Sequence, residues 1–177
     1  MTHRIDVLIG EAEIAARVDA LAREVAAALP ADLMVVVILK GSFVFAADLI
    51  RALVRAGLAP TVDFMTLASY GEGTESAGHV RFARDLTEPV AGRRVLLVDD
   101  IFESGRTLAF ARETLASRGA LEVRSCVLLE KPAKRAVALA PDHVGFTIAD
   151  RFVVGYGLDL AHAYRGLPFI GVVVEAD

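Results

Sequence analysis

The sequence predicts a single α/β domain, residues 1–177, in which a mostly parallel central sheet is flanked by helices. With 177 residues the chain has the length of one domain with a sizeable core. Residues 33–39 and 95–98 are short, continuous apolar runs, which are typical of parallel strands buried on both faces. Helical patterns alternate with such runs, and this order predicts right-handed connections between parallel strands.

Local patterns predict each element in turn. Apolar side chains recur at helical spacing between residues 11 and 29, which predicts an amphipathic helix that Pro30 ends. Residues 69–78 are polar and rich in glycine, so we expect a mobile loop there. The other expected elements are a strand at 33–39, a helix at 43–56, strands at 62–68, 80–84 and 95–98, a helix at 105–118, a strand at 123–129, and short strands at 147–148, 153–154 and 169–174 that complete or cap the sheet.

Composition and charge argue against several classes of protein. The chain is 55% hydrophobic and 24% charged with a net charge of -4, which disfavours both disorder and nucleic-acid binding. Its longest uncharged run, residues 166–174, is far too short for a membrane helix, and Asp6 and Glu11 interrupt the place of a signal peptide. We therefore expect a cytoplasmic protein with no membrane or nucleic-acid partner. The single Cys126 has apolar neighbours and is expected to be buried.

The segment after Val98 has the clearest chemical pattern. Two carboxylates, Asp99 and Asp100, follow a buried strand, where a charge is costly unless a cation or hydrogen-bond donors meet it. Residues 103–107 then bring an acid, a glycine, two hydroxyls and an arginine to the start of a helix, whose backbone N–H groups suit a phosphate. The combination predicts a sugar-phosphate site, although Ser104 alone could simply cap the helix.

Residues 95–108, VLLVDDIFESGRTL, resemble the phosphoribosyl diphosphate binding motif of the type I phosphoribosyltransferases. Four further segments are similar in order and spacing to the hypoxanthine-guanine branch of that family: residues 39–41, 69–70, 128–132, and 152–159 with Arg165. The resemblance covers the chain from about residue 33 to its end. It implies a type I phosphoribosyltransferase fold with a small hood subregion.

The implied activity is that of a 6-oxopurine phosphoribosyltransferase of purine salvage. Hypoxanthine or guanine would react with phosphoribosyl diphosphate, with Mg²⁺ as cofactor, to give IMP or GMP and pyrophosphate. Two alternatives stay open, a xanthine-preferring enzyme and a nucleotide-binding regulator of the same fold. Such regulators lack an acid at the position of Glu103, which favours the enzyme. We expect a homodimer or a homotetramer.

The resemblance also assigns residues to subsites. The ribose and its 5′-phosphate would be bound by Asp99, Asp100, Glu103, Ser104, Gly105, Arg106 and Thr107. Pyrophosphate would be bound by Lys40, Gly41, Ser69, Tyr70 and Arg165. The purine would meet Lys131 at its 6-oxygen, the ring of Phe152, the Val153 backbone at its N1 and C2 edge, and Asp159 at its 2-amino group. The implied metal ligands are Asp99, Asp100 and Asp159.

Glu103 would be the catalytic residue, relaying a proton at the purine N7. The family usually has an aspartate there, so the glutamate lengthens the arm by one methylene. Arg106 similarly stands where many relatives have a lysine, and it serves a phosphate equally well.

Simpler interpretations exist for several of these residues. Lys131 could be a surface turn lysine, Phe152 a core residue, and Arg165 the partner of a neighbouring acid. Tyr156 is expected to pack rather than to act in catalysis. We expect solvated side chains at His3, His143, His162 and Lys134.

Overall fold

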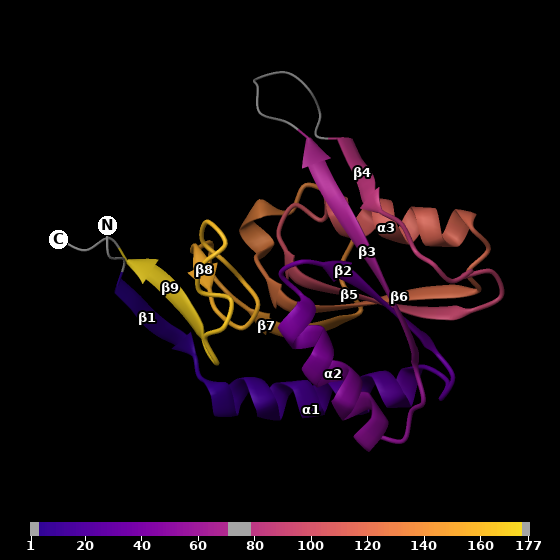
Figure 1. Cartoon of the computed structure of the whole chain (residues 1–177), viewed down its shortest axis with the longest axis horizontal. Helices are drawn as coiled ribbons and strands as arrows, with labels where there is room; N and C mark the ends of the chain where they lie inside the picture. The colour runs from indigo at the N-terminus through magenta and orange to yellow at the C-terminus, as the bar shows by residue number, and fades with distance from the viewer. Residues whose placement is uncertain (1–3, 71–78, 175–177) are drawn as a thin grey trace.

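The computed structural model describes residues 4–70 and 79–174 (Figure 1). Within these residues the chain forms a six-stranded sheet, a separate three-stranded sheet and helices that cover the larger sheet. The elements are β1 (Arg4–Ile9), α1 (Glu11–Ala28), β2 (Met34–Leu39), α2 (Phe43–Arg55), β3 (Thr61–Tyr70), β4 (His79–Arg84), β5 (Arg94–Phe102), α3 (Arg106–Ser117), β6 (Glu122–Glu130), a 3₁₀ turn (Pro132–Lys134), β7 (His143–Thr147), β8 (Val153–Val154) and β9 (Ile170–Val174).

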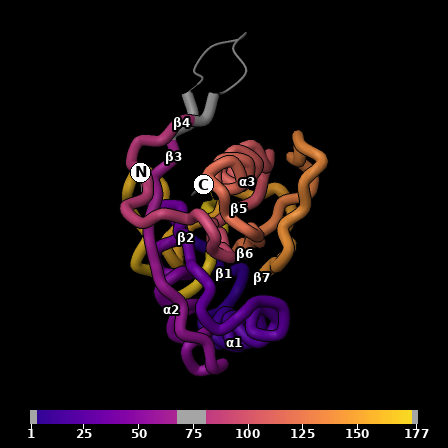
Figure 2. Tube along the Cα trace, turned by 90° about the vertical axis from the view of Figure 1, so that its right-hand side faces the viewer, coloured from indigo at the N-terminus to yellow at the C-terminus, as the bar shows by residue number. Residues whose placement is uncertain are grey.

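The larger sheet has the order β4-β3-β2-β5-β6-β7, and its strands are parallel except for the antiparallel edge pair β3 and β4. The predicted α/β class and mostly parallel sheet are therefore confirmed. Strand β2 is buried on both faces: Val35 and Val37 pack in the core with α1 and α2, whereas Val36 and Ile38 pack in the core with α3. Figure 2 shows α1 and α2 on one side of this sheet and α3 on the other.

The smaller sheet, β1-β9-β8, corresponds to the expected hood. Strands β8 and β9 were expected, but β1 was not, because this strand is largely exposed and has no clear alternation of apolar and polar residues. It pairs antiparallel with β9, a strand near the other end of the sequence, so that Arg4 pairs with Val174. β7 completes the larger sheet and begins earlier than residues 147–148, where a strand was predicted.

The hairpin of β3 and β4 differs from the prediction at its tip. Ser69 and Tyr70 pair with Val80 and His79, so they continue β3 instead of belonging to a loop. The remainder of the predicted loop, residues 71–78, lies outside the described residues.

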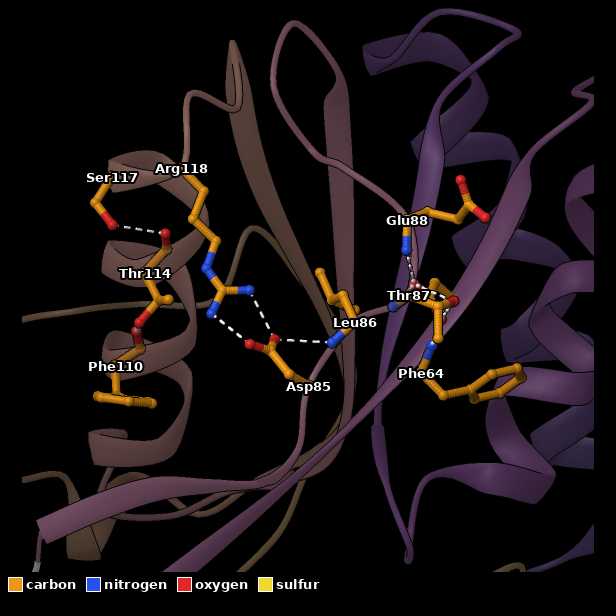
Figure 3. Close-up of polar contacts among 10 residues, drawn as sticks. Phe64, Asp85, Leu86, Thr87, Glu88, Phe110, Thr114, Ser117 and Arg118 are labelled. Atoms are coloured by element: carbon orange, nitrogen blue, oxygen red, sulfur yellow. Dashed lines mark hydrogen bonds and ion pairs between the residues drawn. The ribbon is translucent and has the colours of Figure 1, made fainter.

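Two aspartates hold the base of this hairpin (Figure 3). Asp63 of β3 is buried and accepts backbone N–H groups from Phe64 at 2.8 Å, Thr87 at 2.8 Å and Glu88 at 2.9 Å. Burial alone would raise the pKa of Asp63, but these hydrogen bonds outweigh it and lower the pKa. Asp85 accepts both arms of the Arg118 guanidinium at 2.7 Å, which ties the segment after β4 to the end of α3.

Cys126 and His143, which lie outside the site, are both buried. Cys126 is buried as predicted. His143 was expected to be solvated, which is wrong: the side chain is buried where β7 meets α1, with Nδ1 3.7 Å from Glu24 Oε2. His162 and Lys134 are exposed as predicted, and Lys134 also pairs with Asp150 at 2.9 Å.

None of the helices in residues 4–70 and 79–174 has both the length and the apolar character that crossing a membrane requires.

Candidate active site

The site forms where the parallel strands β2, β3, β5 and β6 end. The sequence analysis placed Asp99 and Asp100 after the strand, which is wrong. β5 continues to Phe102, so both aspartates belong to the strand. Because side chains alternate along a strand, the two carboxyl groups reach different cavities. Asp100 lines a cavity of about 450 Å³, and Asp99 lines one of about 260 Å³ beside the start of α3.

The larger cavity unites most of the residues assigned to pyrophosphate and purine. Its walls come from the ends of β2, β3, β5 and β6 and from the chain after β8. It is lined by Leu39, Lys40, Gly41, Thr66, Leu67, Asp100, Ile101, Glu103, Lys131, Phe152, Val153, Leu158, Asp159 and Arg165. The proposed contacts of Ser69 and Tyr70 with pyrophosphate stay a prediction.

The smaller cavity is formed by residues 103–107, which we call the phosphate loop. Glu103, Ser104, Gly105 and Thr107 line it, whereas the side chain of Arg106 is exposed and does not. Gly105 has φ +80°, and a Cβ there would lie 2.5 Å from Val137 Cγ2 and 2.8 Å from the Phe102 ring. The loop therefore needs glycine at this position both for its backbone conformation and for space.

Burial raises the pKa of both strand aspartates. The pKa of Asp99 is raised well above its ordinary range by burial and by the charge of Asp100, and burial also raises the pKa of Asp100. Each carboxyl group accepts one backbone N–H, from Asp100 at 3.0 Å and from Ile101 at 2.8 Å respectively. A cation would stabilise both ionised carboxylates.

These two carboxylates suit Mg²⁺, which prefers oxygen ligands and is usually held by one or two carboxylates together with substrate phosphates. Within the described residues no cluster of three or more acidic, histidine or cysteine side chains could hold a metal ion. Asp100 in the larger cavity, or Asp99 in the smaller one, could hold such an ion together with oxygens of the substrate.

Lys131 and Glu103 form an ion pair next to the C-terminal end of β6. Lys131 is only 4% exposed, and its Nζ lies 2.5 Å from Glu103 Oε1. Its backbone N–H donates to the Phe102 carbonyl at 2.9 Å, which continues the β5–β6 pairing past the end of β6. Lys131 is thus a cavity residue and not a surface turn lysine.

Arg165 both lines the cavity and pairs with an acid, so the ion-pair interpretation is confirmed and its contact with pyrophosphate stays a prediction. Its guanidinium contacts Asp159 Oδ1 at 2.6 Å and the Gly157 carbonyl at 2.6 Å. Asp159 also accepts the His162 N–H at 2.8 Å, and its assignment as a metal ligand stays a prediction. Gly157 packs on Gly41, since a Cβ there would lie 2.2 Å from the Gly41 carbonyl oxygen.

Gly41 in turn packs on Asp100. A Cβ at Gly41 would lie 1.6 Å from Asp100 Oδ2, so only glycine leaves room for this carboxylate. The peptide bond between Leu39 and Lys40 is cis. The glycine at position 41 is thus explained by its close contact with Asp100.

Phe152 and Tyr156 differ in their exposure. Phe152 is 56% exposed at the wall of the cavity, so it is not a core residue, and the adjacent Val153 is buried. Tyr156 is buried away from the cavity, and its hydroxyl donates to Asp48 Oδ2 at 2.7 Å. Burial and this hydrogen bond to Asp48 raise the pKa of Tyr156, which fits packing and not proton transfer.

Sequence reasoning missed five lining residues, which are Leu39, Thr66, Leu67, Ile101 and Leu158. One signal was available for two of them: β3 is parallel to β2, and Thr66 pairs with Leu39 at the end of β2, so the two residues lie at the same edge although β3 continues to Tyr70. Nothing local marks Leu158 or Ile101.

Comparisons with known proteins agree with this site. The family model of the phosphoribosyl transferase domain matches residues 10–161. The hypoxanthine phosphoribosyltransferase of Escherichia coli K12 is 43% identical and is covered over 99% of its length, with 100% of this chain aligned. That of Buchnera aphidicola subsp. Schizaphis graminum is 42% identical, with 98% of each chain covered.

Solved structures agree as well. A hypoxanthine-guanine phosphoribosyltransferase from Bacillus anthracis has a TM-score of 0.88 at 39% identity, covering 98% of this chain and 100% of that one. A hypoxanthine phosphoribosyltransferase from Staphylococcus aureus has a TM-score of 0.89 at 38% identity, covering 96% and 91%. The family model and the relatives that align over the whole chain show that the chain belongs to the phosphoribosyl transferase domain family.

Proposed function

We propose that this protein is a 6-oxopurine phosphoribosyltransferase of purine salvage, which converts hypoxanthine or guanine and phosphoribosyl diphosphate into IMP or GMP and pyrophosphate. The observation that carries the proposal is the Lys131–Glu103 pair in the cavity of Asp100. One buried ammonium and one carboxylate there face the same space. These groups match the 6-oxygen and the N7 proton of a 6-oxopurine.

The reaction replaces one bond at the anomeric carbon of the ribose. A purine nitrogen attacks this carbon as its bond to the pyrophosphate oxygen breaks, and the bonding electrons leave with pyrophosphate. Glu103 accepts the proton that the purine gives up at N7. A bound Mg²⁺ would neutralise charge on the diphosphate.

Each subsite is proposed to bind one part of the substrates. The phosphate loop and the N-terminus of α3 bind the 5′-phosphate through backbone N–H groups. Asp99 and Asp100 hold the ribose hydroxyls, directly or through the metal, and Lys40, Gly41, Ser69, Tyr70 and Arg165 bind pyrophosphate. Arg106 would have to turn towards the loop to contribute its guanidinium.

The purine subsite explains base selection. The Lys131 ammonium donates to a 6-oxygen but has no acceptor in the 6-amino group of adenine. Phe152 stacks on the ring, the Val153 backbone meets the N1 and C2 edge, and Asp159 meets the 2-amino group of guanine or contributes to the metal site. The proposal includes Mg²⁺ as cofactor, a homodimer or homotetramer, and the cytoplasm as the place of action.

An assay of the purified protein with phosphoribosyl diphosphate, Mg²⁺ and hypoxanthine, guanine, xanthine, adenine or uracil tests the proposal. We expect nucleotide formation with hypoxanthine or guanine and none with adenine or uracil. A clear preference for xanthine would replace the proposed substrate. No turnover with any base would overturn the enzymatic role.

A further inference from the structure

The chain after β6 lies against the phosphate loop. Residues 131–137, which we call the brace, donate the Lys131 N–H to the Phe102 carbonyl and the Ala136 N–H to the Ser104 carbonyl, both at 2.9 Å. Val137 closes the space beside Gly105, where an added Cβ would be 2.5 Å away. The brace therefore forms one wall of the loop that is proposed to bind the 5′-phosphate.

The ring of Phe102 packs against the same loop at Gly105. Its side chain is 2% exposed, and its ring carbons lie 2.8 and 2.9 Å from the position of a Cβ on Gly105. Phe102 also directly precedes Glu103 in the chain. A shift of this ring would displace both the backbone at Gly105 and the carboxylate of Glu103.

Arg135 is the side chain of the brace that covers this ring. Its Cζ lies 5.4 Å from the centre of the Phe102 ring, and its guanidinium also pairs with Glu130 at the end of β6. A planar guanidinium can stack on an aromatic face while its N–H groups bond a carboxylate, and a lysine ammonium lacks that geometry. Arg135 thus fixes the brace to both strands that carry the site.

We propose that Arg135 is a positioning residue that keeps the phosphate loop and Glu103 in their working geometry. Arg135 lines neither site cavity, so it acts through Phe102 and Glu130 and does not touch the substrate. This inference rests on the proposed function for the identity of what the loop binds. Small displacements of positioned groups are sufficient to slow an enzyme strongly.

The test compares Arg135→Ala and Arg135→Lys with the parent, using Arg55→Ala as a matched control. Arg55 is also an arginine in an exposed ion pair, to Asp19 at 2.7 Å, but it lies at the end of α2 and lines neither site cavity. The measurements are kcat and KM for phosphoribosyl diphosphate, the Kd of ribose 5-phosphate by calorimetry, and the melting temperature.

We expect Arg135→Ala to raise KM and the ribose 5-phosphate Kd and to lower kcat, each by about tenfold. Its melting temperature should match that of Arg55→Ala, whose kinetics should equal those of the parent. Arg135→Lys should lie between, at about threefold, because it keeps the charge near Glu130 without the planar stack.

The proposal is overturned if Arg135→Ala stays within twofold of Arg55→Ala in all three constants. It is also overturned if the loss of activity only follows a loss of folded protein. If Arg135→Ala does not fold, Arg135→Lys alone tests the proposal. Values of kcat, KM and Kd for Arg135→Lys that equal those of the parent would then refute it. A parent that binds ribose 5-phosphate but transfers no phosphoribosyl group from phosphoribosyl diphosphate to any purine would instead refute the proposed function, and the calorimetric comparison would still test Arg135.

Discussion

Lys131 Nζ lies 2.5 Å from Glu103 Oε1, so the residue proposed to read the purine 6-oxygen is paired with the residue proposed to take the purine proton. Lys131 is almost fully buried, and a buried ammonium needs such a partner. The longer arm of glutamate, compared with the aspartate usual in the family, makes this contact while Glu103 still lines both cavities.

Replacing Glu103 by glutamine separates proton transfer from positioning. Glu103→Gln keeps the size and an oxygen that can accept from Lys131, so binding of phosphoribosyl diphosphate should be nearly unchanged. Because the amide cannot take a proton, kcat should fall by about 10² to 10⁴-fold. Glu103→Asp is the control, and it should retain much of the activity. Single-turnover rates decide, and a glutamine variant within about threefold of the parent contradicts the assignment.

Removing the ammonium of Lys131 should weaken recognition of the 6-oxo group. Lys131→Met keeps the length of the side chain but removes the donor, so kcat/KM for hypoxanthine should fall by about 10 to 150-fold, as expected for a lost charged hydrogen bond. Lys134→Met serves as the control, because this nearby lysine is exposed and pairs with Asp150. Efficient use of adenine by the unmodified protein would show that Lys131 does not select the base.

Gly105 provides a test of the phosphate loop. An alanine at this φ of +80° would meet Val137 and Phe102, and we expect Gly105→Ala to weaken ribose 5-phosphate binding by at least about tenfold. Gly92→Ala is a matched control, because Gly92 has φ +74° with no atom within 4 Å of an added Cβ. Both variants should lose about 1–2 kcal/mol of stability from the left-handed backbone, and Gly105→Ala should lose more because of its contacts with Val137 and Phe102, but only Gly105→Ala should lose binding by calorimetry. Equal affinities would contradict the proposed loop.

The elements that the sequence predicted best are those whose burial is local and continuous. β2 and β5 are apolar because both faces of each strand are covered, and this pattern is visible in a short window. β1 gave no such signal, since Val7 and much of that strand are exposed and, among residues 4–70 and 79–174, it pairs only with β9 at the other end of the chain. His143 was misjudged for a related reason, because its burial depends on α1 packing over β7.

The sugar-phosphate site was predicted from the residues after Val98, and the roles of single residues were predicted from the resemblance; neither depended on periodicity. That Lys40 and Asp100 line one cavity follows from the parallel order of β2 and β5, whereas Arg165 reaches it from the irregular chain between β8 and β9. The brace could not be predicted, since the contacts of Arg135 with Phe102 and of Val137 with Gly105 depend on the path of an irregular segment. The same holds for the outward direction of Arg106, which its spacing in the motif does not determine.

Asp63 should govern the acid stability of the hairpin that carries Ser69 and Tyr70. Three backbone N–H groups converge on its buried carboxylate, so Asp63→Asn places an amide donor among donors and should cost about 2–3 kcal/mol near neutral pH. Asp85→Asn is the control: its carboxylate pairs with Arg118 near the surface, so the loss should be smaller, about 0–1 kcal/mol, and should shrink in salt.

The pH dependence of that difference checks the cause. The pKa of Asp63 is lowered in the folded state, so its contribution is fully present above its ordinary value of 3.8 and is lost as the pH falls through the lower folded value. Urea unfolding of the parent and Asp63→Asn should therefore differ most at about pH 6, and the difference should shrink as the pH falls below 3.8 and through the lower pKa of the folded state. A difference that stays constant over this range would mean that the variant loses packing and not the ionised carboxylate. Convergence would show that the charge of Asp63 is what its three N–H donors stabilise.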